Sequence, residues 1–106
     1  MLPRWILLAL IVAPLELGSV SAHAATVQIV MDKLVFAPLE TQAKVGDTIE
    51  WINKDILAHT ATATGGDWNV VIAPNKTEKL VLQKAGSVDY YCKYHPNMKG
   101  RIVIAP

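Results

Sequence analysis

The chain has 106 residues, a formal net charge of +1 and a single cysteine, Cys92. This near-neutral balance, without a basic stripe, excludes nucleic acid as an expected partner, and the length allows one small domain. A lone cysteine also excludes a disulfide within the chain, so the thiol must bridge two chains, react, or be held by a ligand.

Residues 1–24 have the three parts of a secretory signal peptide. Arg4 supplies the positive charge, residues 5–13 are an unbroken apolar run, and Ala22-His23-Ala24 gives a small-x-small cleavage pattern. A transmembrane anchor is the alternative, but this apolar run falls well short of the roughly 20 residues that span a bilayer. We therefore expect cleavage after Ala24, with Ala22 as the alternative site. The mature protein is then expected in the periplasm, without a membrane span.

The remaining residues, 25–106, are expected to form one all-β domain. Short apolar stretches alternate with turn signals, and no helical period is sustained. Pro38 is expected to end regular pairing or to mark an edge. We predict a small Greek-key β-sandwich of about seven or eight strands. The expected strands cover residues 26–30, 41–44, 48–53, 59–63, 68–72, 77–82, 87–91 and 101–104, and a short apolar stretch at residues 34–36 leads to Pro38.

Alternation with a period of two assigns the faces of these strands. Ile49, Trp51 and Asn53 share one face, and if the first two face the core then so does the amide of Asn53. A buried amide needs hydrogen-bond partners. Tyr90 and Cys92 likewise share a face, which places the sulfur of Cys92 at a strand end and turned inward.

Four side chains have the chemistry of a copper site. Cys92, His95 and Met98 are spaced three residues apart, and His59 stands on a separate predicted strand. Two imidazoles and a thiolate in a trigonal plane, with a weak axial thioether, are the ligands of type 1 (blue) copper. Thiolate and thioether suit Cu(I), and imidazole suits both oxidation states. The sequence therefore predicts one type 1 copper ion per chain, with Met98 as the axial ligand and the other three residues as equatorial ligands.

Each of these residues has an ordinary explanation when it is taken singly. A buried cysteine, a core methionine and two surface histidines are all common, but together they do not explain the spacing. Zinc is the nearest metallic alternative, although it favours cysteine, histidine and carboxylate over methionine. A nucleophilic Cys–His pair would need an orienting residue and an accessible cleft. After the expected cleavage only His59 and His95 remain, too few for further coppers, so an enzyme is not expected.

The chain resembles the cupredoxins over essentially the whole domain, and most closely the amicyanin and pseudoazurin branch. Two residues separate His95 from Met98, as in amicyanin, whereas plastocyanin and pseudoazurin place four there. The motifs that carry the resemblance are residues 44–48, 51–53, 59–60, 86–92 and 95–100.

The ligand loop departs from the amicyanin pattern without losing a ligand. Lys93-Tyr94 stands where amicyanin-like loops carry Thr-Pro, Asn97 replaces an aromatic residue, and Ala58 replaces a proline. These changes alter the surface around His95, so the amine-dehydrogenase partner of amicyanin is not carried over.

The resemblance implies a fold, a supporting residue and a function. Asn53 is expected to tie the His59 segment to the Cys92 loop. The protein is expected to be a monomer that carries single electrons between protein redox partners docking near His95, and not an enzyme. The alternative is a periplasmic copper-binding chaperone or scavenger, which hands over the ion. Such proteins usually expose runs of methionine or histidine, and this sequence has neither.

Overall fold

The computed structural model describes residues 23–106, so the expected signal peptide lies outside them apart from its last two residues. These described residues form nine β-strands and no helix, and hence no helix that could cross a membrane. The strands are β1 (Thr26–Asp32), β2 (Val35–Ala37), β3 (Glu40–Lys44), β4 (Thr48–Asn53), β5 (His59–Ala63), β6 (Asn69–Ile72), β7 (Thr77–Val81), β8 (Gly86–Tyr91) and β9 (Lys99–Ala105).

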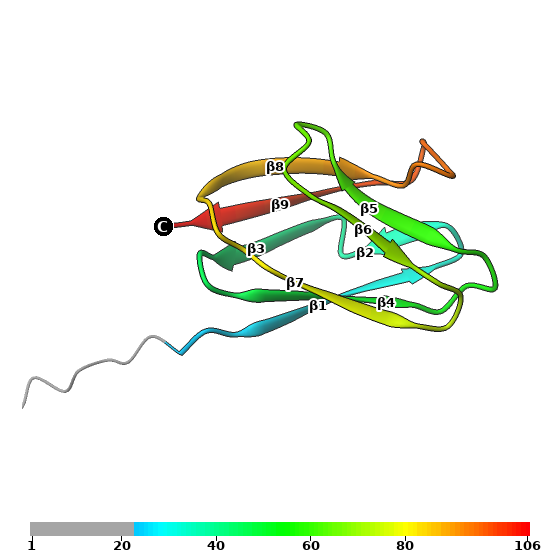
Figure 1. Cartoon of the computed structure of the whole chain (residues 1–106), viewed down its shortest axis with the longest axis horizontal. Coiled ribbons are helices and arrows are strands. Elements are labelled where there is room, and N and C mark those ends of the chain that lie inside the picture. Colours follow the sequence, from blue (N-terminus) through cyan, green and yellow to red (C-terminus); the bar gives the residue numbers. More distant parts are fainter. Residues whose placement is uncertain (1–22) are drawn as a thin grey trace, which may run out of the picture.

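The strands form two sheets that face each other (Figure 1). One sheet has the order β2-β1-β4-β7 and the other β3-β9-β8-β5-β6. The pairs β1–β4 and β3–β9 are parallel, and the remaining pairs are antiparallel. The predicted all-β sandwich is therefore confirmed.

The short strand β2 accounts for the difference from the predicted strand number. Three residues are too few to show an alternating pattern, and β2 exists because it pairs with the end of β1. The chain then crosses from one sheet to the other between β2 and β3, at Pro38. Pro38 ends regular pairing at this point, as predicted.

Alternating side chains from both sheets form the core. Ile49 and Trp51 are fully buried and Asn53 is 1% exposed, which confirms their predicted shared face. Tyr90 and Cys92 are also buried on one face, as predicted. Burial of this kind contributes about 25 cal/mol for each Å² of apolar surface removed from water.

Aromatic rings pack around the strand that leads to Cys92. The Tyr90 ring has its centroid 4.6 Å from that of Phe36, 5.9 Å from that of Trp51 and 5.7 Å from that of Trp68. A side chain at Gly100 would place its Cβ 2.5 Å from Tyr90 Cζ, so glycine on β9 makes room for this ring. Burial raises the pKa of Tyr90, which keeps its hydroxyl neutral. The cluster fixes the end of β8 immediately before Cys92.

Candidate metal centre

Three strand ends bring the four predicted ligands to one end of the sandwich. His59 is the first residue of β5, Cys92 follows the last residue of β8, and Met98 precedes the first residue of β9. The loop from Cys92 to Met98 projects at that end, opposite the end at which β1 begins (Figure 1). Strands β5 and β8 are neighbours, so residues far apart in sequence meet here.

The structure brings two imidazoles and the thiol into one cluster. The Nδ1 atoms of His59 and His95 lie 3.6 Å and 3.7 Å from Cys92 Sγ. These three donor atoms lie within 4.8 Å of one another, so one ion can reach all of them at ligand distances of about 2.0–2.3 Å. His59 and Cys92 are 0% exposed, whereas His95 is only partly buried. The cluster therefore meets solvent through one imidazole.

Met98 is held against the same loop by backbone hydrogen bonds. Its N–H donates to the carbonyl of His95 at 2.8 Å, and its own carbonyl accepts from the N–H of Cys92 at 3.0 Å. The N–H of His95 donates in turn to the carbonyl of Cys92 at 3.2 Å. Met98 is 3% exposed, so its thioether is inside the fold at the loop that carries the cysteine.

A carboxylate fixes the orientation of the His59 ring. His59 Nε2 lies 2.7 Å from Asp55 Oδ2, and Asp55 also accepts the backbone N–H groups of Lys33 at 2.7 Å and Leu34 at 3.1 Å. Burial raises the pKa of Asp55, but the hydrogen bonds from His59, Leu34 and Lys33 outweigh it and the pKa is lowered. The carboxylate therefore keeps the imidazole proton on Nε2 and leaves Nδ1, the atom facing Cys92, free to bind a metal.

Thr60 connects the two segments that carry the buried ligands. Its backbone N–H donates to Cys92 Sγ at 3.3 Å, and its Oγ1 accepts the N–H of Lys93 at 2.8 Å. Thr62 Oγ1 lies 2.9 Å from Thr60 Oγ1 and completes the buried hydroxyl pair. A hydrogen bond to the sulfur stabilises the thiolate form that a metal requires.

The contacts of Asn53 correct its predicted role. Its Nδ2 donates to the carbonyl of Leu57 at 2.8 Å, and its Oδ1 accepts the N–H of Asp55 at 2.9 Å, so it does support the segment that leads to His59. Its other Nδ2 contacts run to the carbonyls of Ile72 and Ala73 at the end of β6. The attachment to the Cys92 loop is made by Thr60 instead, because Asn53 ends β4 in the opposite sheet.

Asp55 and Thr60 were not predicted from the sequence. The available signals were a carboxylate four residues before a ligand histidine and a hydroxyl directly after it. Neither signal specifies a contact by itself, because the loop conformation decides where the carboxylate points. The structure thus adds two residues that orient the predicted ligands.

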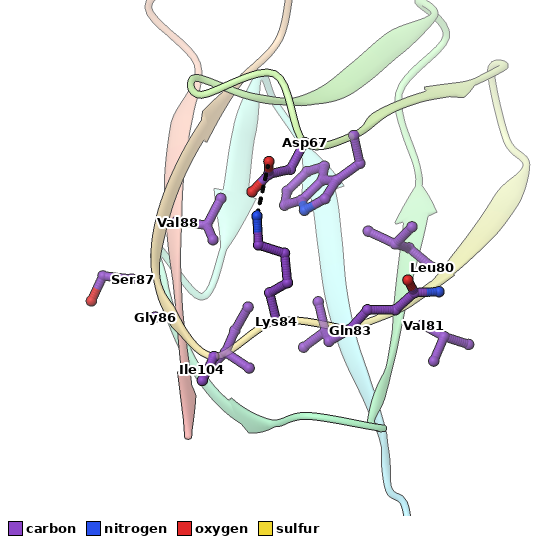
Figure 2. A pocket seen from close by; sticks show the side chains of 12 residues that line it. Asp67, Leu80, Val81, Gln83, Lys84, Gly86, Ser87, Val88 and Ile104 are labelled. Carbon is purple, nitrogen blue, oxygen red and sulfur yellow. Dashed lines mark ion pairs between the residues drawn. The ribbon is translucent and has the colours of Figure 1, made fainter. Parts of the chain in front are cut away.

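One hollow of the described residues is separate from this cluster. A cavity of about 450 Å³ lies between the two sheets and is lined by Trp68, Leu80 and Val88 among others. Figure 2 shows Lys84 extended across it toward Asp67, and their charged atoms are 3.6 Å apart. None of the four predicted ligands lines this cavity.

The family model for the Cupredoxin-like domain matches residues 4–104. The chain is a member of the cupredoxin family. Amicyanin of Paracoccus denitrificans is 30% identical over 99 residues, which cover 86% of this chain and 76% of that protein. Amicyanin-alpha of Methylorubrum extorquens is 28% identical over 89 residues, covering 78% and 75% of the two chains.

Solved structures agree with this membership. The crystal structure of amicyanin from Paracoccus versutus matches with a TM-score of 0.65 and 27% identity, over 81% of this chain and 85% of that one. A purple cupredoxin from Nitrosopumilus maritimus matches with a TM-score of 0.66 over 74% of this chain and 99% of that one. At 22% identity the second likeness concerns the fold alone. The predicted resemblance to the cupredoxins is confirmed, and amicyanins are among the relatives that match.

The donor set of this cupredoxin fits copper. It offers one sulfur and two imidazole nitrogens from buried or half-buried side chains, with a further buried thioether on the same loop. Soft sulfur donors combined with imidazole select copper, whereas zinc sites favour a closed set without methionine. Family membership and this donor set together make copper the cofactor of the chain.

Proposed function

We propose that this cupredoxin is an exported, single-domain electron carrier and not an enzyme. Residues 1–24 are the proposed signal peptide and residues 25–106 the mature domain, located in the periplasm. His59, Cys92, His95 and Met98 are the proposed ligands of one type 1 copper ion, which supplies a one-electron couple when bound. The likeness to amicyanins over most of the chain supports this assignment.

One observation carries the proposal: the cluster is buried except at His95. His59 and Cys92 are fully buried, and the ring of His95 packs edge to face against that of His59 with centroids 5.1 Å apart. An electron can therefore leave or enter through the imidazole of His95, while the remaining donors stay away from water. This arrangement suits transfer of an electron better than release of the ion.

The residues around the cluster keep it in one geometry. Asp55 holds the proton of His59 on Nε2, and the N–H of Thr60 donates to Cys92 Sγ. Asn53 fixes the loop between β4 and β5 through Leu57 and Asp55. Because these groups are already in place, little reorganisation is required when the charge of the centre changes.

An apolar surface at the same end is the proposed docking face for protein redox partners. Leu34 is 44% exposed, Ile56 84%, Leu57 46% and Tyr94 55%. Single exposed apolar residues are common, but several on the loops around one half-buried ligand favour protein docking. We expect the chain to act as a monomer that binds its donor and acceptor in turn.

Chelator competition separates the carrier from a copper chaperone or scavenger. A carrier should retain copper in both oxidation states and give a reversible one-electron wave in cyclic voltammetry. A chaperone should lose Cu(I) readily to a competing thioether or thiol ligand. Rapid loss of Cu(I) from the wild-type protein, with no reversible wave, would favour the alternative.

Met98→Gln is expected to keep copper bound but to lower the reduction potential. The thioether favours Cu(I), whereas the amide oxygen of glutamine favours Cu(II). Cyclic voltammetry of wild type and variant measures the shift, and Met31→Gln is not a suitable control because Met31 is in the core. Asn97→Gln, an exposed change beside Met98, is the matched control. A potential that is unchanged or raised by Met98→Gln contradicts the axial role.

Asp55→Asn is expected to weaken copper binding by about 10–100-fold, because partners of ligand histidines typically have effects of this size. The variant loses the negative charge that accepts the proton of His59 Nε2, so Cu(II) is destabilised relative to Cu(I) and the potential should rise. Competition with a chromogenic chelator measures the affinity. Asp67→Asn, a surface carboxylate that pairs with Lys84, is the control. If Asp55→Asn and Asp67→Asn changed the copper affinity equally, Asp55 would have no specific role at the copper site.

A further inference from the structure

Asp47 anchors the start of the folded chain. The backbone N–H of Ala25 donates to Asp47 Oδ1 at 2.9 Å, and the N–H of Lys44 donates to Asp47 Oδ2 at 2.9 Å. The carbonyl of Ala25 accepts the N–H of Thr48, also at 2.9 Å. Ala25 is therefore held through both of its backbone groups, and Asp47 itself is 3% exposed.

The carboxylate of Asp47 is ionised near neutral pH. The hydrogen bonds from the backbone of Ala25 and Lys44 lower its pKa below the usual value. In the uncleaved chain the group at Ala25 is a neutral amide N–H. A positive charge at the same nitrogen would make this hydrogen bond charge-assisted, and such bonds are roughly twice as strong as neutral ones.

We infer that the export signal peptidase cleaves the Ala24–Ala25 bond and that the new α-ammonium group of Ala25 pairs with Asp47. This inference rests on the proposed export. Water adds across the amide, so Ala24 leaves with a carboxylate at the end of the leader and Ala25 gains an ammonium group. An α-amino group has a pKa of about 7.7–8.0, so it is mainly charged at neutral pH.

The position of Ala25 selects between the two candidate cleavage sites, after Ala22 and after Ala24. Cleavage after Ala22 leaves His23 and Ala24 attached, so the nitrogen of Ala25 remains a neutral amide. Cleavage after Ala24 puts the ammonium on the nitrogen that lies 2.9 Å from Asp47 Oδ1. The ion pair exists only after processing, so the precursor has the neutral hydrogen bond to Asp47 but not its stronger, charge-assisted form. This difference suits a secretion route that requires the precursor to stay unfolded.

The first test is the N-terminus of the exported protein. The full 106-residue chain is produced with its own leader in a Gram-negative host, and the periplasmic fraction is analysed by intact mass and N-terminal sequencing. We expect a chain that begins at Ala25. A chain that begins at His23 overturns the inference while leaving export intact, and an uncleaved cytoplasmic chain overturns both.

The second test measures the ion pair in copper-loaded protein that begins at Ala25. Acetylation of its α-amine removes the charge and should lower the melting temperature at pH 7. The same acetylation should have no effect in the Asp47→Asn variant, and it should keep its effect in Glu78→Gln, which changes an exposed carboxylate on β7. If acetylation lowered the melting temperature of the wild type and of Asp47→Asn equally, the proposed ion pair would be overturned.

A longer chain keeps this test decisive if Asp47→Asn does not fold. In protein that begins at His23 the α-amine is displaced by two residues, so acetylation should leave the melting temperature unchanged. If acetylation lowered the melting temperature equally in the chains that begin at Ala25 and at His23, the α-amine charge would act without Asp47 and the ion pair would be overturned. Because β1, which follows Ala25, begins at the end of the sandwich opposite the loop between β8 and β9, acetylation should not alter the reduction potential (Figure 1). Failure of the electron-carrier proposal would appear in voltammetry and leave these outcomes unchanged.

Discussion

Replacing Cys92 with serine is expected to abolish the blue colour of the oxidised, copper-loaded protein. The intense visible band of a type 1 site is a charge transfer from the thiolate to Cu(II), and Cys92 is the only cysteine of the chain. Its sulfur lies 3.6 Å and 3.7 Å from the two imidazole nitrogens that complete the cluster. A hydroxyl at this position cannot supply the band, even if the histidines retain the ion.

Visible absorption at one copper per chain measures this effect. Ser87→Ala, an exposed change on β8, the strand that leads to Cys92, is the control and should leave the band intact. Far-ultraviolet circular dichroism of Cys92→Ser checks that the β-sandwich persists. A wild-type protein that binds one Cu(II) without colour would contradict the type 1 assignment and favour the copper-handling alternative.

Replacing Asn53 with alanine is expected to destabilise the fold by about 2–4 kcal/mol, because it removes a buried amide from several partners at once. The side chain is 1% exposed and bonds to the carbonyls of Leu57 and Ile72 and to the N–H of Asp55. These backbone groups would be left buried or partly buried without their partner. Since Asp55 holds His59, the substitution should also weaken copper binding.

Chemical denaturation of the copper-free protein isolates the effect on folding, and chelator competition then gives the effect on the metal. Asn97→Ala changes an exposed asparagine of the ligand loop and should alter stability by less than about 0.5 kcal/mol. If Asn53→Ala were as stable as Asn97→Ala, the hydrogen bonds of Asn53 would contribute nothing to the fold.

Properties that belong to single residues or to their spacing were predicted from the sequence. The soft-donor chemistry of Cys92 and Met98 depends on residue type, and the loop between them is too short to separate them widely. The inward faces of Trp51 and Tyr90 follow from the two-residue period of a strand, and both side chains are buried in the structure. The all-β sandwich follows from the same local periodicity.

Contacts between distant segments were beyond prediction from the sequence. The hydrogen bond from Thr60 to Cys92 joins residues 32 positions apart in the sequence. The hydrogen bond from Lys33, in the turn between β1 and β2, to Asp55 joins residues 22 positions apart. Such contacts depend on strand order, register and loop direction, none of which a single sequence displays.

The sequence by itself determined the four candidate ligands and the buried faces that carry Trp51 and Tyr90, because residue type, spacing and strand period are local properties. The tertiary structure alone decided that His59 is oriented by Asp55, that Thr60 rather than Asn53 connects it to the Cys92 loop, and that His95 is the half-buried member of the cluster. The physical reason is that hydrogen bonds and burial at the site depend on how the two sheets are placed against each other.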